Sequence, residues 1–256
     1  MTRRIWLTGA SSGIGHALAV ELLDQGHQLA LSARSNEPLQ ALAQRYPGQV
    51  LVAAGDLTEA DQVRTIGIRI RQEWGALDSA ILNAGTCEYV EVSQFEAAMI
   101  ERMLRGNLMS AAYCIEAALP LLRKGNQAHL VAIGSSVTYA ALPRAEAYGA
   151  SKAGLRYLME TLRIDLASEG IAVTLVSPGF VDTPMTAQND FPMPFTWSVK
   201  KAAQTIARRL TKQPYEISFP LPFVGILRLI GALPKFLQVA IGKRLARPAT
   251  PVESTL

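Results

Sequence analysis

Three side chains between residues 135 and 152 have the types and spacing of an acid–base centre. Tyr148 and Lys152 are four residues apart in a stretch with helical apolar spacing, so they share one face of the expected helix. A phenol has a pKa of about 10, and we expect the nearby ammonium of Lys152 to lower it toward neutrality. Ser135 precedes the loop into this helix, where its hydroxyl can hold a carbonyl oxygen while Tyr148 transfers a proton.

The same pair has a plain structural alternative, in which Tyr148 lies at an interface and Lys152 is a solvated surface residue. A tyrosine and a lysine at this spacing recur by chance on many helices, so the pair alone does not distinguish the two interpretations. The catalytic interpretation depends on a second feature that could hold a reactant beside them.

A glycine-rich segment, Thr8–Gly15, is that feature. It follows the apolar run Ile5–Leu7 and precedes a stretch with helical apolar spacing, so it turns a first strand into a first helix. At such a turn a dinucleotide pyrophosphate can rest on free backbone N–H groups and the positive end of the helix dipole. Gly9 permits a tight turn, Gly13 a close approach of the cofactor, and Gly15 close packing of helix on sheet. The spacing is not the commoner G-x-G-x-x-G, and a tight connection without a ligand is the alternative.

The rest of the chain alternates strand and helix patterns that can position these residues. Strands are expected at residues 5–7, 28–33, 50–53, 77–82, 128–133, 171–176 and 215–219. Helices are expected at residues 16–23, 37–45, 58–74, 93–122, 145–168 and 198–211. This alternation predicts one α/β domain, a doubly wound parallel sheet with right-handed crossovers and helices on both faces. Ligands of such sheets bind beyond the carboxyl ends of the strands.

Composition is typical of one such domain. The chain has 256 residues, of which 49% are hydrophobic and 18% charged, so it can bury a core and is not disordered. The net charge is +4 without a dense basic run, which gives no indication of nucleic-acid binding. Cys87 and Cys114 have no metal-binding spacing and are expected to be ordinary thiols in a reducing cytoplasm. No signal peptide or membrane-spanning run is expected.

Six motifs along residues 3–185 stand in the order of the short-chain dehydrogenase/reductase family, which the chain resembles. Two of them are the Thr8–Gly15 turn and the set of Ser135, Tyr148 and Lys152. The other four are Asp56-Leu57, Asn83-Ala84-Gly85, Asn107 in the long fourth helix, and the segment Pro178–Thr183. The resemblance implies a single Rossmann-type domain over residues 1–256 with strand order 3-2-1-4-5-6-7.

The resemblance also implies an oxidoreductase that passes hydride between a nicotinamide and a carbonyl carbon. It assigns four catalytic roles: Tyr148 gives the proton, Ser135 orients the oxygen, Lys152 tunes Tyr148 and holds the nicotinamide ribose, and Asn107 sustains a proton path through water. A polar residue at a helix kink is the alternative for Asn107. The residues expected to contact the cofactor are Gly9, Ser11, Ser12, Gly13, Ile14, Gly15, Arg34, Asp56, Leu57, Asn83, Ala84, Gly85, Tyr148, Lys152, Pro178, Gly179, Val181 and Thr183. No metal is expected.

Cofactor choice depends on the end of the second strand. An enzyme that prefers NAD presents an Asp or Glu there to the ribose 2′-hydroxyl. This strand ends in Ala33 and Arg34, with no acid, and a guanidinium matches a 2′-phosphate in geometry and charge. We therefore expect NADP(H) rather than NAD(H). The alternative is that Arg34 faces solvent and caps the turn.

Two later segments are expected to form the substrate side. Residues 186–212 begin with a proline- and aromatic-rich stretch, expected to be a lid over an apolar or bulky substrate. Residues 220–247 form an apolar and basic extension. Its apolar first part ends at Pro234, and a basic amphipathic stretch follows that proline. About 13 residues before the break would make a helix of about 20 Å, too short for a hydrocarbon core of about 30 Å. The extension can be a wall of the substrate pocket, a subunit contact, or a membrane-surface contact through Lys235, Lys243, Arg244 and Arg247.

The expected reaction therefore interconverts a small-molecule carbonyl and a secondary alcohol with NADP(H). Two rival functions remain: an NAD-dependent alcohol dehydrogenase, and a non-catalytic nucleotide-sensing protein on the same fold. The helix over residues 145–168 has more apolar positions than one sheet face requires, and family members pair this helix between subunits. We therefore expect a homodimer or homotetramer, located in the cytoplasm, with peripheral membrane contact through the extension left open.

Overall fold

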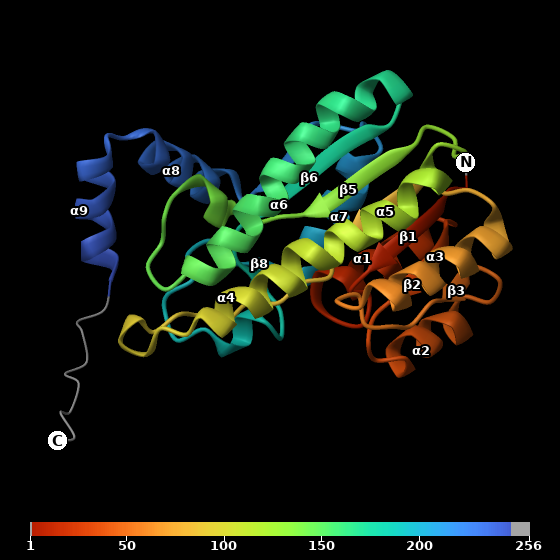
Figure 1. Ribbon diagram of the computed structural model, residues 1–256, viewed down its shortest axis with the longest axis horizontal. Helices are drawn as coiled ribbons and strands as arrows, with labels where there is room; N and C mark the ends of the chain where they lie inside the picture. The colour runs from red at the N-terminus through yellow and green to blue at the C-terminus, as the bar shows by residue number, and fades with distance from the viewer. Residues whose placement is uncertain (1, 247–256) are drawn as a thin grey trace.

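Seven parallel strands form the central sheet of the computed structural model, which describes residues 2–246 (Figure 1). They are β1 (Arg4–Thr8), β2 (Gln28–Ser32), β3 (Val50–Val52), β4 (Ser79–Leu82), β5 (His129–Ile133), β6 (Ala172–Pro178) and β9 (Glu216–Phe219). Their order is β3-β2-β1-β4-β5-β6-β9, which confirms the predicted doubly wound sheet. The last strand is β9 because two short strands, β7 (Val181–Asp182) and β8 (Trp197–Ser198), pair with each other outside this sheet.

The sheet separates two layers of helices. The helices are α1 (Gly13–Asp24), α2 (Glu37–Arg45), α3 (Ala60–Trp74), α4 (Ala97–Leu104), α5 (Ser110–Leu122), α6 (Glu146–Asp165), α7 (Val199–Leu210), α8 (Leu221–Ala232) and α9 (Lys235–Leu245). Side chains of α3, α5 and α6 share one hydrophobic cluster with the sheet, and side chains of α1, α2 and α7 share the other. Each face of the sheet is therefore buried, as right-handed crossovers require.

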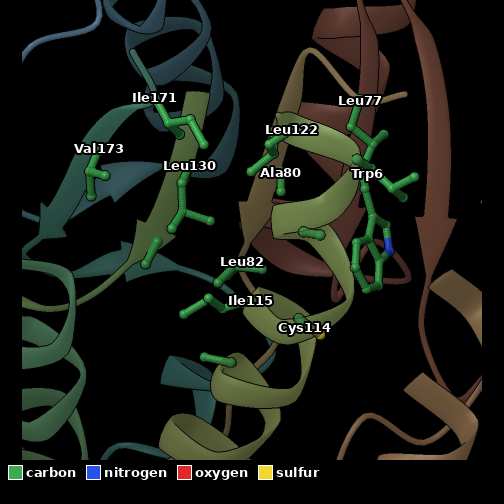
Figure 2. Packing of buried hydrophobic residues seen from close by; sticks show 14 of the residues in the cluster. Trp6, Leu77, Ala80, Leu82, Cys114, Ile115, Leu122, Leu130, Ile171 and Val173 are labelled. Atoms are coloured by element: carbon green, nitrogen blue, oxygen red, sulfur yellow. The ribbon is translucent and has the colours of Figure 1, made fainter. Parts of the chain in front are cut away.

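The core explains why the strands read as continuous apolar runs. Leu7 of β1 pairs with Leu31 of β2 and with Ile81 of β4 in register, and all three are buried. Trp6 points to the opposite face, where its indole N–H donates to the Ser32 hydroxyl at 2.9 Å. Figure 2 shows Trp6 in the cluster formed by β1, β4, β5, β6 and α5, together with the thiol side chain of Cys114, which is free and buried.

The long helix expected over residues 93–122 is divided in the structure. A 3-10 turn (Val92–Gln94) precedes α4, and a π turn (Arg105–Met109) separates α4 from α5. Gly106 and Asn107 are poor helix formers, and the extra residue of a π turn redirects side chains inside a helix. The backbone is helical from Ala97 to Leu122 with the π turn inside it, so the prediction of one long helix is wrong only at its start, where Phe95 and Glu96 are extended.

A charged pair fixes the amino-terminal edge of the sheet. The Asp78 carboxylate accepts hydrogen bonds from the Arg4 N–H at 2.8 Å, the Arg4 Nη2 at 3.0 Å and the Asn126 N–H at 2.8 Å. Burial alone would raise the pKa of Asp78, but these bonds outweigh burial and lower it. The pair therefore joins β1, β4 and the turn before β5 at the end of the sheet opposite the strand carboxyl ends.

The C-terminal extension begins with a helix that folds back onto the body of the protein. Phe223 and Leu227 of α8 are buried against Ala140, and a Cβ on Gly231 would overlap the Tyr139 carbonyl oxygen. Arg228 of α8 donates to Glu216 at 2.8 Å. Helix α8 is thus part of the packed fold beside the loop that follows β5. The predicted range reaches residue 247, and Arg247 lies outside the described residues.

Candidate active site

A cleft of about 650 Å³ lies at the carboxyl ends of the strands. It brings together all but two of the site residues expected from the sequence. Its wall includes Gly9, Ser11, Ser12, Gly13, Ile14, Arg34, Asp56, Leu57, Asn83, Ala84, Gly85, Ser135, Tyr148, Lys152, Pro178, Gly179, Val181 and Thr183. Gly15 and Asn107 lie behind this wall, where each supports residues that face the cleft.

The glycine-rich turn between β1 and α1 is shaped by close approaches of backbone to backbone. Gly9 has a φ of 65°, and a Cβ on it would lie 2.8 Å from the Cα of Ala84. A Cβ on Gly15 would overlap the Gly9 carbonyl oxygen. α1 begins at Gly13, and no side chain among residues 2–246 caps it, so its first N–H groups can bind an anion. This cradle fits the pyrophosphate of a dinucleotide.

Asn83 joins the end of β4 to the end of β1 beneath the cradle. Its Nδ2 donates to the carbonyl oxygens of Thr8 and Gly9, both at 3.1 Å. In return the Thr8 hydroxyl accepts from the N–H groups of Asn83 at 2.9 Å and Ala84 at 3.0 Å. These four bonds fix two neighbouring strand ends, so the floor of the cleft has a defined shape.

Ser135, Tyr148 and Lys152 meet at the inner end of the cleft. Ser135 follows β5, and its Oγ accepts from the Val137 N–H at 3.2 Å, which orients the hydroxyl. Tyr148 and Lys152 lie one turn apart on α6, with the Lys152 Nζ 5.9 Å from the centre of the Tyr148 ring. Lys152 is buried, and its Nζ donates to the Ile133 carbonyl oxygen at 2.9 Å.

Burial is the main influence on the pKa values of Tyr148 and Lys152. Burial raises the pKa of Tyr148, the neighbouring Cys87 adds to the rise, and a hydrogen bond with Ser135 opposes it. Burial also lowers the pKa of Lys152 to about 8. The expected lowering of the Tyr148 pKa by Lys152 is not seen in this structure, because burial is the largest cause of the shift and Lys152 is not among its causes. Tyr148 is a neutral phenol at pH 7.

Asn107 lies in the π turn and faces the catalytic helix. Its Oδ1 accepts from the Thr86 N–H at 2.7 Å, and its Nδ2 donates to the Thr86 carbonyl and the Ser151 hydroxyl, both at 2.9 Å. A Cβ on Gly85 would lie 2.8 Å from the Asn107 Oδ1 and 3.3 Å from the Lys152 Nζ. Asn107 and Lys152 are thus separated only by the backbone of a glycine.

Arg34 and Asp56 line the outer end of the cleft, after β2 and β3. The Asp56 Oδ1 accepts from the Thr58 N–H at 2.9 Å and the Thr58 hydroxyl at 2.8 Å. The bond from the Thr58 N–H is the largest cause that lowers the pKa of Asp56, and the charge of Arg34 contributes to it. Arg34 is exposed, so its guanidinium is accessible to a ligand in the cleft.

Sequence reasoning missed the part of the rim that comes from the segment after β4 and from α4. Glu88 and Arg102 form an ion pair there at 2.8 Å, and Arg105 lies one turn further along the helix. No motif marks these residues. Only their spacing could have indicated this part of the rim. Arg102 and Arg105 are three residues apart shortly before Asn107, so they lie on one face of a helix.

Four aromatic rings, here called the aromatic wall, form a row that ends on α8: Tyr89, Phe191, Phe180 and Phe223. Tyr89 and Phe191 pack edge to face with their centres 5.2 Å apart. Phe180 lies 6.0 Å from Phe191 and 5.2 Å from Phe223. Burial raises the pKa of Tyr89, and both Cys87 and Tyr148 add to the rise, which places this end of the wall beside the catalytic phenol.

Arg144 connects the segments that border the cleft. Its guanidinium forms ion pairs with Glu91 at 2.6 Å and Asp190 at 2.9 Å and lies 5.4 Å from the centre of the Tyr89 ring. Its φ is 64°, a left-handed conformation that is costly for a long side chain. Loops that follow β4, β5 and β6 therefore meet at one residue.

Comparisons with known proteins agree with this geometry. The family model described as short chain dehydrogenase matches residues 3–192. An uncharacterized oxidoreductase of Myxococcus xanthus is 33% identical, covering 95% of this chain and 97% of that protein. An uncharacterized oxidoreductase of Mycobacterium tuberculosis is 32% identical, covering 91% of this chain and 94% of that protein.

Solved structures share the fold. The complex of Pseudomonas aeruginosa RhlG with NADP has a TM-score of 0.77 and 27% identity, covering 87% of this chain and 96% of that one. An alcohol dehydrogenase from the archaeon Thermococcus sibiricus, complexed with 5-hydroxy-NADP, has a TM-score of 0.76 and 24% identity, covering 86% and 96%. The second likeness concerns the fold alone.

Proposed function

Because this chain belongs to the short-chain dehydrogenase family, we propose that it is an NADP(H)-dependent oxidoreductase that interconverts a carbonyl and a secondary alcohol. The observation that carries the proposal is that Ser135, Tyr148 and Lys152 meet in one cleft with the glycine-rich cradle. When bound, the nicotinamide supplies or accepts the hydride.

The protein side chains then handle the oxygen and the proton. Tyr148 gives its proton to the carbonyl oxygen, and Ser135 donates a hydrogen bond that orients this oxygen. At pH 7 Tyr148 keeps its proton, so the phenol is in the form that can donate to a carbonyl oxygen. Lys152 holds the nicotinamide ribose, and Asn107 sustains the path by which Tyr148 regains a proton.

The end of β2 supports NADP(H) over NAD(H). Arg34 stands on the cleft wall where an NAD-preferring enzyme presents an acid, and the Pseudomonas aeruginosa neighbour was solved with NADP. We expect Arg34→Ala to weaken NADPH binding by about 10- to 100-fold, the loss of a charge-assisted contact. Fluorescence titration should show NADH binding nearly unchanged. Equal weakening of both cofactors would contradict the assignment.

The substrate is proposed to be apolar or bulky, with residues 186–212 as its lid. The aromatic wall begins beside Tyr148 and continues through Phe191, which lies within this segment. The decisive experiment is oxidation of NADPH by the purified protein with a panel of ketones and aldehydes of increasing apolar size. Activity that rises with apolar size supports the proposal, whereas NADPH binding without turnover of any panel member would favour a nucleotide-sensing protein.

We also propose a homodimer or homotetramer. Leu155 and Met159 of α6 are buried in the core, but Tyr157 and Ile164 on the same helix are exposed by 72% and 74%. Light scattering at micromolar concentration should therefore give two or four times the chain mass of 27.7 kDa. Tyr157→Ser combined with Ile164→Ser should shift the mass toward that of one chain. A wild-type protein of single-chain mass would exclude this assembly.

A further inference from the structure

The C-terminal helices carry apolar side chains that the rest of the described chain does not cover. On α8, Ile226 and Leu229 are exposed by 48% and 67%, whereas Phe223, Val224 and Leu227 of the same helix are buried. On α9, none of the eleven residues is buried. We call the exposed apolar residues of the two helices the C-terminal apolar surface; they are Leu221, Ile226, Leu229, Phe236, Leu237, Val239 and Leu245.

This surface is unusual for a helix in contact only with water. The adjacent residues Phe236 and Leu237 are both exposed, so apolar side chains stand on more than one side of α9, which is not the amphipathic helix expected from the sequence. An isolated helix of this length is marginal in water, and helices in proteins are stabilised chiefly by packing. Figure 1 shows α9 standing away from the sheet, joined to the body through α8. This surface is therefore available to a further partner.

The charge of the segment identifies the partner. Residues 217–246 contain four cations and no Asp or Glu. Arg228 is paired with Glu216, while Lys235, Lys243 and Arg244 form no ion pair within residues 2–246. A second copy that paired through α9 itself would bring cations against cations. An anionic surface with an apolar layer beneath it satisfies both the cations and the apolar side chains.

A lipid bilayer has this structure. We propose that α8 and α9 bind the interface of an anionic membrane, with one side of the C-terminal apolar surface entering the boundary of the acyl chains and the three cations reaching the headgroups. Within residues 2–246, no helix is long and apolar enough to cross a membrane, so the contact is with one face only. Phe223 belongs to both α8 and the aromatic wall, which places the membrane contact next to the proposed substrate side of the cleft.

Flotation of the full chain with lipid vesicles tests the proposal independently of catalysis. At low salt the wild-type protein should float with vesicles of phosphatidylglycerol and phosphatidylcholine. With vesicles of phosphatidylcholine alone it should remain in the bottom fraction. Lys243→Gln combined with Arg244→Gln should weaken binding by about 30-fold, since each cation near an anionic surface contributes about fivefold. High salt should weaken wild-type binding as well.

A triple variant, Phe236→Ser, Val239→Ser and Leu245→Ser, removes apolar contacts without touching a buried residue. It should fail to float, while a matched control, Ile68→Ser with Val92→Ser at exposed apolar sites elsewhere, should float like the wild type. Turnover of a water-soluble ketone should be unchanged in both.

Three outcomes would overturn the proposal. The first is a wild-type protein that remains in the bottom fraction when anionic vesicles float at low salt. The second is a triple variant that floats as well as the wild type. The third is a triple variant whose mass by light scattering falls to a fraction of the wild-type mass in the absence of lipid, which would show that a second copy covers this surface.

Discussion

Tyr148→Phe is expected to lower kcat by about 1,000-fold, within the roughly 100- to 10,000-fold that a positioned acid contributes. The substitution removes one hydroxyl and keeps the ring, so the packing of α6 and the hydrogen bond from Lys152 to Ile133 should survive. Because the hydroxyl is used in the transition state rather than in binding, kcat/KM should fall by a similar factor while NADPH affinity stays constant. Steady-state kinetics and fluorescence titration measure the two quantities.

A matched control lies on the same helix. Tyr157 is exposed by 72%, and Tyr157→Phe should leave kcat unchanged. Ser135→Ala tests whether the Ser135 hydroxyl orients the carbonyl oxygen. This substitution should also lower kcat without loss of cofactor binding. A Tyr148→Phe enzyme with nearly normal kcat would show that another group donates the proton.

Asp78→Ala is expected to lower the free energy of unfolding by about 3 kcal/mol, the low end of the cost of breaking a buried ion pair. The Asp78 side chain is only 7% exposed, and its loss leaves two N–H groups and the Arg4 guanidinium without their acceptor. Urea denaturation at pH 7 measures the difference from the wild type. The exposed pair of Asp61 and Arg64 provides the control, because Asp61→Ala should change stability little.

The effect of Asp78 should depend on pH with a defined sign. The folded-state pKa of Asp78 is lowered, so its contribution to stability is complete above its unfolded pKa of about 4. It is lost as the pH falls through the lowered folded value. The stability difference between wild type and Asp78→Ala should therefore shrink in acid, and a constant difference from pH 7 to strong acid would contradict this account.

The sequence was sufficient to predict the sheet and its carboxyl-end site. Alternating apolar strands and helices specify the doubly wound topology, and each motif directly follows a strand, so the topology alone brings residues such as Gly9 and Ser135 to one edge. The close approach at Gly15 was also predictable, because only a glycine fits where helix and sheet backbones meet.

Other features depend on contacts between residues distant in sequence. The π turn places Asn107 where its Oδ1 accepts from the Thr86 N–H, a contact that periodicity cannot reveal. The pKa of Tyr148 depends on how deeply the finished fold buries it, and the spacing to Lys152 gave the wrong sign. The aromatic wall joins Tyr89 to Phe223 through rings from three separate segments. Such features need the tertiary structure.

Arg144 has a consequence for the order in which the molecule gains and loses structure. Its two ion pairs, to Glu91 and Asp190, join loops that meet only after β4, β5 and β6 lie side by side. Once the strands are paired, the loops are already close together, so the ion pairs form with little further loss of chain entropy. Both carboxylates are more than half exposed, and contacts of this kind open locally at a lower free energy than the core. We therefore expect the entrance to the cleft to become ordered after the sheet during folding and to open locally before the sheet does.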